Sequence, residues 1–471
     1  MLCFSRKLMI KLFSGLSTSI SVRSSRLGCL GSHVLSCHKS SSKPRIDPII
    51  MKLDSPEFKA LFTPELKSLV SMFEKYNYEI RIAGGAVRDL LMGKAPKDLD
   101  FATVATPDQM REMFTKEEVR MINQRGESHG TITPRINDKE NFEVTTLRID
   151  VETDGRHAKV VFTEDWLLDA NRRDLTINSM FLGLDGTVYD YFNGYEDLMN
   201  KRVLFVGNAE DRIREDYLRI LRYFRFFGRI ASDPHDYDAE TINVISSNLE
   251  GLNKIAGERI WSELRLIISG NSGPLILCKM LEIGIAPYIG LPKEHNMDEL
   301  HYVIDRTKDF QLNPVSYLAA VLNNMSEAIT LNSRLKLSVF ERELAYFIVA
   351  NRGEELSEKP LLPFQKLMLH TKFKLSDVQQ WCVETLRYNG RHKLAEEMKE
   401  WTMPRLPVTG NDLKDHVTQT KKMALVVRKL KDYWADNDYK PGTEELISIV
   451  PKILEEANDD ENRIAKKKKV S

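Results

Sequence analysis

Two aspartates, a glycine pair and an arginine lie within one short segment, Arg81 to Thr103, in an order that suits chemistry on phosphates. Gly84 and Gly85 follow strand-forming residues and precede a helical pattern that ends at Gly93. Glycine lets a backbone approach an anion closely, and the first turn of a helix directs N–H groups toward it. Arg88, one turn into that helix, can donate paired hydrogen bonds to phosphate oxygens. The segment therefore predicts a triphosphate-binding turn.

Asp98 and Asp100 are expected on one face of a strand, because residues two apart along a strand point the same way. Two carboxylates this close repel each other unless a cation lies between them. Mg²⁺ usually binds through one or two carboxylates plus substrate phosphates. A glycine pair alone is usually a turn, and a lone Asp-x-Asp is usually a solvated strand end. Their ordered combination with Arg88 instead favours metal-assisted nucleotidyl transfer.

A second group of charged residues begins at Asp216 and repeats every three positions, at Arg219, Arg222 and Arg225. We expect these residues along one face of a helix, where a salt-bridged, solvated surface is the simpler interpretation. Three aligned arginines beside aromatic residues favour an anionic partner.

The Asp216–Arg219 pair could also select a base. Cytosine and adenine present an amino donor beside a ring-nitrogen acceptor, and a carboxylate with a neighbouring guanidinium matches both groups. Uracil and guanine mismatch both contacts. The pair therefore predicts selection of CTP and ATP against UTP and GTP.

A third motif, Arg172-Arg173-Asp174, precedes a polar turn at Thr176. Asp174 could cap a helix that begins near this threonine, and a role at a nucleotide site is compatible with such a cap. Of the two arginines, Arg173 is the preferred candidate for a nucleotide contact.

Together these segments resemble the nucleotidyltransferase domain of the DNA polymerase beta superfamily. They resemble more closely the class II CCA-adding enzymes and the related bacterial poly(A) polymerases, from about Ile80 to at least Leu264. The resemblance implies that Asp98 and Asp100 are catalytic and bind Mg²⁺. It implies nucleotide binding by residues of all the motifs: Gly84, Gly85, Arg88, Arg172, Arg173, Asp174, Asp216, Arg219, Arg222 and Arg225.

Three further segments fit the resemblance. Glu143, on the strand pattern 141–148, is either a third catalytic carboxylate or a structural strand residue. The polar segment 154–159 resembles a loop that family members need in order to switch from C to A addition. The segment 257–264 matches a family helix, in which we expect Trp261 and Leu264 to be core residues without chemistry.

The pattern of elements predicts an α+β protein. We expect a polymerase-beta-like head with a mixed β-sheet, then an all-α neck, body and tail. The Thr63-Pro64 and Thr106-Pro107 pairs predict helix starts, and Asp185-Gly186 predicts a hairpin turn. The expected parts are a mitochondrial transit peptide (1–46), a nucleotidyltransferase head (47–205), a helical neck with the nucleotide template (206–275), a tRNA-binding body and tail (276–458) and a disordered basic tail (459–471).

The first 46 residues contain eight Lys and Arg, no Asp or Glu, and many serines, which is typical of a mitochondrial transit peptide. We expect the mitochondrial matrix, with a cytosolic or nuclear form as a hypothesis prompted by Met51. The basic run 466–469 is either a nuclear address or part of a disordered tail. Three of the five cysteines lie within the first 46 residues. The other two, Cys278 and Cys382, have no zinc-ligand spacing and form no disulfide framework.

Beyond the leader, 60 basic residues stand against 68 acidic ones, so any tRNA-binding surface must be local. No apolar run reaches membrane-spanning length. A monomer and a homodimer both remain open. The expected activity is template-independent addition of CCA to tRNA 3′ ends from CTP and ATP, with release of pyrophosphate. Poly(A) polymerase on the same fold and a catalytically silent tRNA-binding protein are the alternatives.

Overall fold

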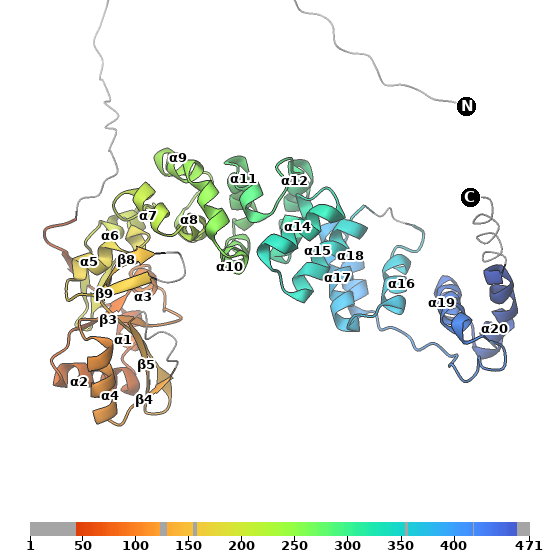
Figure 1. Ribbon diagram of the computed structural model, residues 1–471, viewed down its shortest axis with the longest axis horizontal. Helices are drawn as coiled ribbons and strands as arrows, with labels where there is room; N and C mark the ends of the chain where they lie inside the picture. The colour runs from red at the N-terminus through yellow and green to blue at the C-terminus, as the bar shows by residue number, and fades with distance from the viewer. Residues whose placement is uncertain (1–43, 123–129, 154–157, 354–356, 418, 459–471) are drawn as a thin grey trace, which may run out of the picture. The chain divides into compact units, whose positions relative to one another are not determined.

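The computed structural model describes residues 44–122, 130–153, 158–353, 357–417 and 419–458 (Figure 1). The expected transit peptide up to residue 43, the loop residues 154–157 and the C-terminal segment 459–471 lie outside the described residues. Within the described part, no helix is long and apolar enough to cross a membrane.

A nine-stranded mixed sheet forms the N-terminal part of the described chain. Along the sheet the order is β1 (Ile49–Lys52), β11 (Thr187–Tyr189), β10 (Phe181–Gly183), β2 (Ile80–Ala83), β3 (Asp100–Thr103), β7 (Glu143–Thr146), β5 (Thr131–Ile136) and β4 (Arg120–Ile122), with β6 (Glu140–Asn141) beside β5. The pairing of β3 with β7 is parallel and the other pairings are antiparallel. A separate hairpin joins β8 (Arg148–Thr153) to β9 (Ala158–Phe162).

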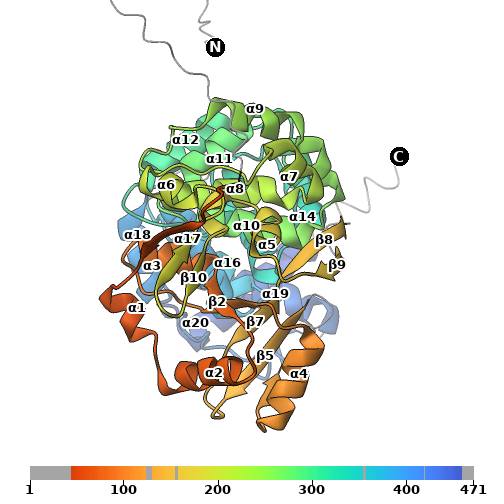
Figure 2. The same cartoon turned by 90° about the vertical axis from the view of Figure 1, so that its left-hand side faces the viewer.

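Each face of this sheet has its own apolar cluster, because successive strand residues point to opposite sides. Phe101 packs in the large core cluster, while its neighbour Ala102 belongs to a smaller one with Trp166 and Phe181. Helices α2 (Pro64–Lys75) and α4 (Pro107–Lys116) supply the first face. Figure 2 shows α2 and α4 near β5 and β7.

The local signals in this part are confirmed. Thr63 and Thr106 each accept a hydrogen bond from a backbone N–H of the following helix, and Thr106 completes a capping box with Gln109. Residues 184–186 form the tight connection between β10 and β11. The mixed sheet and the helices that follow confirm the expected α+β class.

From Val206 onward, the described residues form helices and loops, with no further β-strand. Besides α2 and α4, the helices before Val206 are α1 (Pro56–Ala60), α3 (Gly85–Leu91), α5 (Trp166–Asn171), η2 (Thr176–Asn178) and, after the last strand, α6 (Gly194–Met199). Those after it are α7 (Ala209–Glu215), α8 (Leu218–Ile230), α9 (Ala239–Ser247), η3 (Leu249–Lys254), α10 (Gly257–Ile268), α11 (Gly273–Glu282), η4 (Ala286–Ile289), α12 (Met297–Arg306), α13 (Pro314–Ala320), α14 (Met325–Leu335), α15 (Val339–Asn351), α16 (Leu362–His370), α17 (Leu375–Tyr388), α18 (His392–Glu400), α19 (Thr420–Asp436) and α20 (Thr443–Ser448).

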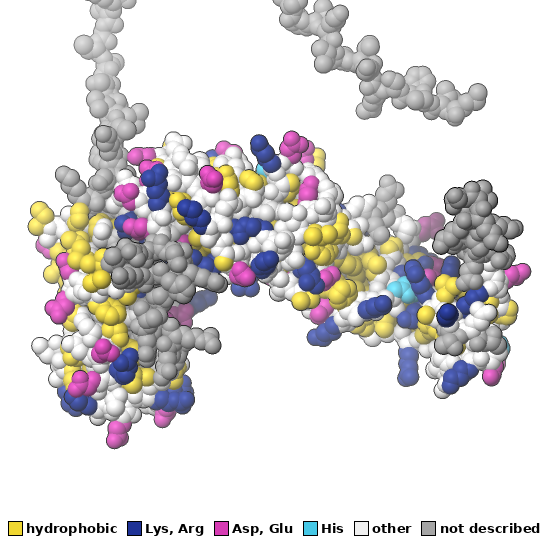
Figure 3. Space-filling view, in the orientation of Figure 1, with side chains coloured by type: hydrophobic (Ala, Val, Ile, Leu, Met, Phe, Trp, Pro, Cys, Tyr) yellow, Lys and Arg dark blue, Asp and Glu magenta, His cyan; other side chains and the backbone are white. Residues whose placement is uncertain are grey.

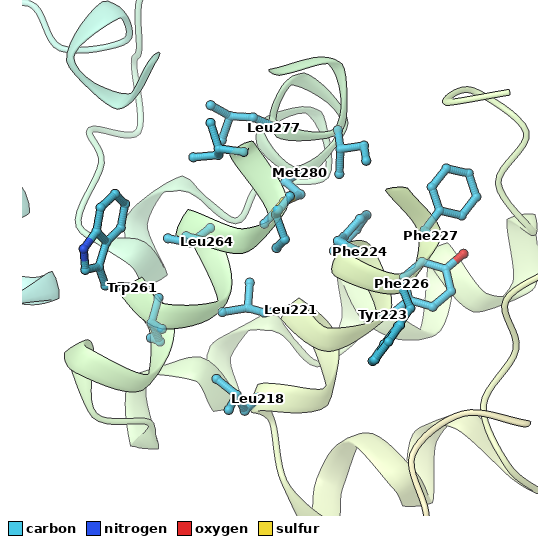
Figure 4. Packing of buried hydrophobic residues seen from close by; sticks show 14 of the residues in the cluster. Leu218, Leu221, Tyr223, Phe224, Phe226, Phe227, Trp261, Leu264, Leu277 and Met280 are labelled. Carbon is cyan, nitrogen blue, oxygen red and sulfur yellow. The ribbon is translucent and has the colours of Figure 1, made fainter. Parts of the chain in front are cut away.

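Helices α8, α10 and α11 pack through a shared apolar layer, which Figure 4 shows from close by. Trp261 is 6% exposed and Leu264 is fully buried, so both are core residues as expected. Helix α11 spans the expected neck–body boundary after residue 275. Farther along the chain, α19 and α20 contribute to a second cluster that includes Leu430 and Leu446.

The first strand, β1, includes residues on both sides of Met51. Asp190 donates its backbone N–H to the Pro48 carbonyl (2.7 Å), and Arg45 donates to the Tyr191 carbonyl (2.9 Å). Ile50 packs against the core cluster. A chain that starts at Met51 therefore lacks half of this strand.

We expect a protein that starts at Met51 to unfold more easily than one that starts at Pro44. The loss of two backbone hydrogen bonds and of the Ile50 contacts should lower the free energy of unfolding by about 2 kcal/mol. Urea unfolding of the two proteins measures the difference. Identical unfolding midpoints would show that residues 44–50 add nothing to the sheet.

Candidate active site

All twelve residues expected at the site line a single hollow of about 680 Å³. This volume is within the range of ligand pockets, roughly 300–1,000 Å³. The residues come from the sheet part and from the following helices: Gly84, Gly85, Arg88, Asp98, Asp100, Arg172, Arg173, Asp174, Asp216, Arg219, Arg222 and Arg225. These twelve residues, which span 141 positions of the sequence from Gly84 to Arg225, thus line the same pocket.

The glycine turn between β2 and α3 has a backbone that requires glycine at its first position. Gly84 has a φ of +68°, and a Cβ there would lie 3.2 Å from Arg173 Nη1. Arg88 is only 4% exposed. It donates to the Asn178 Oδ1 (2.6 Å) and to the Asp89 carboxylate (2.8 Å), which hold its guanidinium at the pocket wall. Its place is therefore determined before any ligand arrives.

The two aspartates share the pocket but not one strand. Asp100 begins β3, whereas Asp98 lies in the bend before it, so the expected strand face includes only Asp100. The parallel register of β3 and β7 puts Glu143 opposite Asp100. A second hollow of about 790 Å³ is lined by Asp98, Asp100 and Glu143 together. The structure therefore brings the sequence candidate Glu143 beside the aspartates.

The pKa of the Asp100 carboxyl is raised, first because surrounding protein displaces water from it and then by repulsion from Glu143 and Asp98. No hydrogen bond or ion pair to Asp98 or Asp100 occurs among the described side chains. The described residues also contain no group of three or more His, Cys, Asp or Glu placed to hold a metal by themselves. Hard oxygen donors in mutual repulsion fit a hard divalent cation that takes its other ligands from water and substrate phosphates.

A buried carboxylate, Asp169, anchors the Arg172-Arg173 pair. It is 1% exposed and accepts hydrogen bonds from Arg172 Nε (2.7 Å), Arg173 Nη2 (3.0 Å) and the Arg148 backbone N–H (3.2 Å). Burial alone would raise the pKa of Asp169, but Arg173 and Arg172 lower it overall. Both arginines are thereby fixed at the pocket wall.

Replacing Asp169 by Asn should destabilise the protein, because two partly buried guanidiniums lose their counter-charge. We expect a loss of about 3 kcal/mol in the free energy of unfolding. Since the folded pKa of Asp169 is lowered, its contribution is present above the unfolded value of about 3.9 and is lost as the pH falls below it. The free energies of unfolding of wild type and variant, measured with urea from neutral to acid pH, should therefore converge as the pH falls. The exposed Asp108→Asn on α4 is the control, and a constant difference down to the lowest pH would contradict the ion-pair account.

Asp174 and Arg222 form a direct ion pair across the pocket. Arg222 Nε donates to Asp174 Oδ2 at 2.6 Å, and the Asp174 Oδ1 accepts the Leu175 N–H at 2.9 Å. Burial would raise the pKa of Asp174, but Arg222 lowers it overall. The expectation that Asp174 caps a helix near Thr176 is wrong, because Leu175 is the N-cap of the short 3-10 helix η2 and no side chain caps it. Asp174 therefore joins the head to α8.

Asp216 and Arg219 both line the pocket, but Asp216 lies outside the helix. It has an extended backbone between α7 and α8, so the expected single helical face begins only at Arg219. Arg259 Nη2 donates to Asp216 Oδ2 at 2.9 Å. Arg219 donates to the Arg172 carbonyl (2.8 Å) and to the Arg212 carbonyl (3.1 Å), while its Nε–H makes no hydrogen bond within the described part of the chain. Each member of the pair is thus oriented by a different neighbour.

Phe226 lies between three of the pocket arginines. Its ring centroid is 4.6 Å from the Arg225 guanidinium carbon, 5.0 Å from that of Arg88 and 5.6 Å from that of Arg222. Cations over an aromatic face are attracted by the ring quadrupole. Arg225 also donates to Glu263 (3.1 Å), and burial raises the pKa of that carboxyl. The ring therefore helps to gather like charges at one wall.

Sequence reasoning missed several residues of this pocket. Arg259 belongs to the segment 257–264, in which we expected no chemistry, yet it lines the pocket. Asp169, which lies behind the pocket wall and anchors Arg172 and Arg173, could have been found, since its spacing of three and four to these arginines is the helical pair spacing. No local signal indicated the other pocket residues: Arg148, Asp150, Asn178, Leu218, Phe226 and Arg229.

The fold has known counterparts. Residues 80–204 match the Poly A polymerase head domain family. The chain is 22% identical to the Bacillus stearothermophilus CCA-adding enzyme in complex with CTP, with a TM-score of 0.63 over 87% of this chain and 100% of that one. A second structure, of a CCA-adding enzyme in apo form II, gives a TM-score of 0.65 at 19% identity. The two structures establish the fold, and the match over residues 80–204 makes this part of the chain similar to the head domain of poly(A) polymerases.

Curated relatives narrow this class. The chain is 50% identical over 407 residues to the mitochondrial CCA tRNA nucleotidyltransferase 1 of Mus musculus and to that of Homo sapiens, which covers 85% of this chain and 93% of each relative. It is 31% identical to the CCA-adding enzyme of Staphylococcus epidermidis over 59% of this chain and 66% of that protein. This chain belongs to the CCA-adding tRNA nucleotidyltransferases, which confirms the family resemblance.

Proposed function

We propose that this protein adds CCA to the 3′ ends of tRNA, using CTP and ATP and releasing pyrophosphate. The observation that carries the proposal is the shared pocket, in which a glycine turn, two unpaired aspartates and the Asp216–Arg219 pair meet. Its arginines suit a triphosphate, its aspartates suit a cation, and Asp216 with Arg219 suits a base edge. The 50% identity to mitochondrial CCA tRNA nucleotidyltransferases supports the same activity.

The reaction is a displacement at the α-phosphorus. The 3′-hydroxyl of the tRNA gives up its proton to water, its oxygen forms a bond to this phosphorus, the bond to the bridging oxygen breaks, and pyrophosphate leaves with the electron pair. Asp98 and Asp100 would hold Mg²⁺, which when bound would stabilise the negative charge on the phosphates and favour loss of the proton from the attacking hydroxyl. Glu143 is a candidate for a third carboxylate at this place. Gly84, Gly85 and Arg88 hold the triphosphate in this proposal.

Base selection rests on the orientation of Asp216 and Arg219. Arg259 uses one oxygen of Asp216, and lone pairs remain to accept from the amino group of cytosine or adenine. The Arg219 Nε–H can donate to the adjacent ring nitrogen. The pocket walls around Asp216 and Arg219 are formed by Arg172, Arg173, Asp174, Arg222 and Arg225. A protein surface thereby replaces a nucleic-acid template.

The remaining parts of the proposal concern organisation and location. We infer a head (47–205), a neck (206–275) and a body with tail (276–458). The body and tail bind tRNA in this proposal. In the view of Figure 3, Lys and Arg side chains are spread over the helical part with acidic ones between them. The composition of residues 1–46 and the mitochondrial relatives support location in the matrix.

The test uses purified protein that starts at Pro44 and tRNA transcripts that lack CCA. CTP alone, ATP alone, both together, UTP and GTP are supplied with Mg²⁺, and products are resolved at single-nucleotide length. Two C additions followed by one A, and no more, are expected. An open-ended A ladder would indicate a poly(A) polymerase, and no incorporation would indicate a silent tRNA-binding protein.

A further inference from the structure

Nearly all the arginines of the pocket form an ion pair with a carboxylate of the protein itself. Nine arginines line it. Eight of these have a carboxylate within ion-pair distance, from Asp89 at Arg88 to Asp216 at Arg259. Within the described residues, Arg229 is the exception. Arg229 is therefore the one arginine lining the pocket that has no carboxylate at ion-pair distance among the described residues, and it is free to pair with a bound anion.

Arg229 belongs to the pocket face of α8. Arg219, Arg222, Phe226 and Arg229 follow at spacings of three and four, so they form one stripe along the helix. Arg229 is exposed and lines the hollow. Burial lowers the pKa of Arg88 and of Arg225, and the nearby charge of Arg229 lowers both further. Arg229 thus lies close enough to Arg88 for the two charges to repel, and an anion between them would relieve this repulsion.

The position along α8 indicates which anion. Ten residues separate Arg219 from Arg229, and this corresponds to about 15 Å along the helix axis. If Arg219 contacts the base, as in the proposed function, Arg229 lies at the opposite end of an extended nucleoside triphosphate. Arg88, at the glycine turn, lies near that same end. A guanidinium that the protein leaves unpaired can form a charge-assisted, forked contact with phosphate oxygens.

We propose that Arg229 binds the terminal phosphates of the incoming nucleotide, the group that leaves as pyrophosphate. This inference rests on the proposed function, because the base end of the nucleotide is assigned through Arg219. Arg229 then distinguishes a triphosphate from a monophosphate without contact to the base. The same contact serves CTP and ATP alike.

The test compares nucleotides that differ only in phosphate number. CTP and CMP binding to the protein from Pro44 onward is measured by equilibrium dialysis with Mg²⁺, for wild type, Arg229→Ala and Arg229→Lys. Loss of one charge-assisted contact should weaken CTP binding about tenfold in Arg229→Ala and leave CMP binding unchanged. Arg229→Lys, which keeps the charge, should recover part of the loss. An equal loss for CTP and CMP, or no loss for either, would overturn the assignment.

A matched control and a second readout separate this inference from the proposed function. Arg265 on α10 is also exposed, lies outside the pocket and makes no ion pair within the described residues, so Arg265→Ala should bind CTP like wild type. In transfer assays, Arg229→Ala should raise KM for CTP and for ATP by similar factors. A raised KM for tRNA alone would place Arg229 on the tRNA backbone and overturn the proposal. Wild-type protein that binds CTP but extends no tRNA would contradict the proposed function while the CTP–CMP comparison still decides the role of Arg229.

Discussion

Asp98→Ala or Asp100→Ala is expected to abolish nucleotide transfer while tRNA still binds. The two carboxylates line the pocket without a hydrogen bond or an ion pair to a described residue, and burial, then repulsion from Glu143 and Asp98, raises the pKa of Asp100. Loss of a metal ligand removes several kcal/mol of transition-state stabilisation, so transfer should fall by about a thousandfold or more. Single-nucleotide extension of tRNA lacking CCA measures this fall, and a filter-binding assay measures tRNA affinity.

Asp108→Ala is the matched control, since Asp108 is an exposed aspartate on α4 outside both hollows. Transfer near the wild-type rate in either pocket variant would refute the metal assignment. Glu143→Ala separates the two interpretations of that residue. A fall comparable to that of Asp100→Ala indicates a third ligand, whereas full activity with lower stability indicates a structural strand residue.

Arg219→Ala is expected to relax the choice among the four nucleotides. Without the guanidinium, uracil no longer opposes a buried donor with the wrong group, and each such mismatch costs about 1–3 kcal/mol. Discrimination between CTP and UTP should therefore fall by about tenfold to a hundredfold. The ratio of kcat/KM for the two nucleotides on one tRNA measures the change.

Arg212→Ala provides the structural control for this variant. Arg212 also joins the neck to the head, since it donates to the Asn171 carbonyl and pairs with Glu215, but it does not line the pocket. It should lower activity toward all nucleotides together and leave their ratio unchanged. If Arg219→Ala still rejects UTP and GTP as wild type does, the protein-template hypothesis is wrong.

Local sequence determined several features correctly because the physics that produces them is local. The threonine caps before α2 and α4, the Asp185-Gly186 turn and the glycine turn at Gly84 each depend on neighbouring backbone geometry. The expected placement of Asp216 on a helix and of Asp98 on a strand was wrong, since strand and helix boundaries there depend on pairing with distant segments. Motif order then connected these local features to a known family.

By itself, therefore, the sequence determined which residue types meet a nucleotide and which family the chain resembles. Only the tertiary structure decided how the charges are paired. Asp216 pairs with Arg259 from α10 and Asp174 with Arg222 from α8, across 43 and 48 positions of the chain. Salt bridges of this kind require close approach of side chains from separate elements, and spacing along the chain does not encode it. For the same reason, Arg229 is distinguished from its eight neighbours only once every other pocket arginine is seen beside a carboxylate.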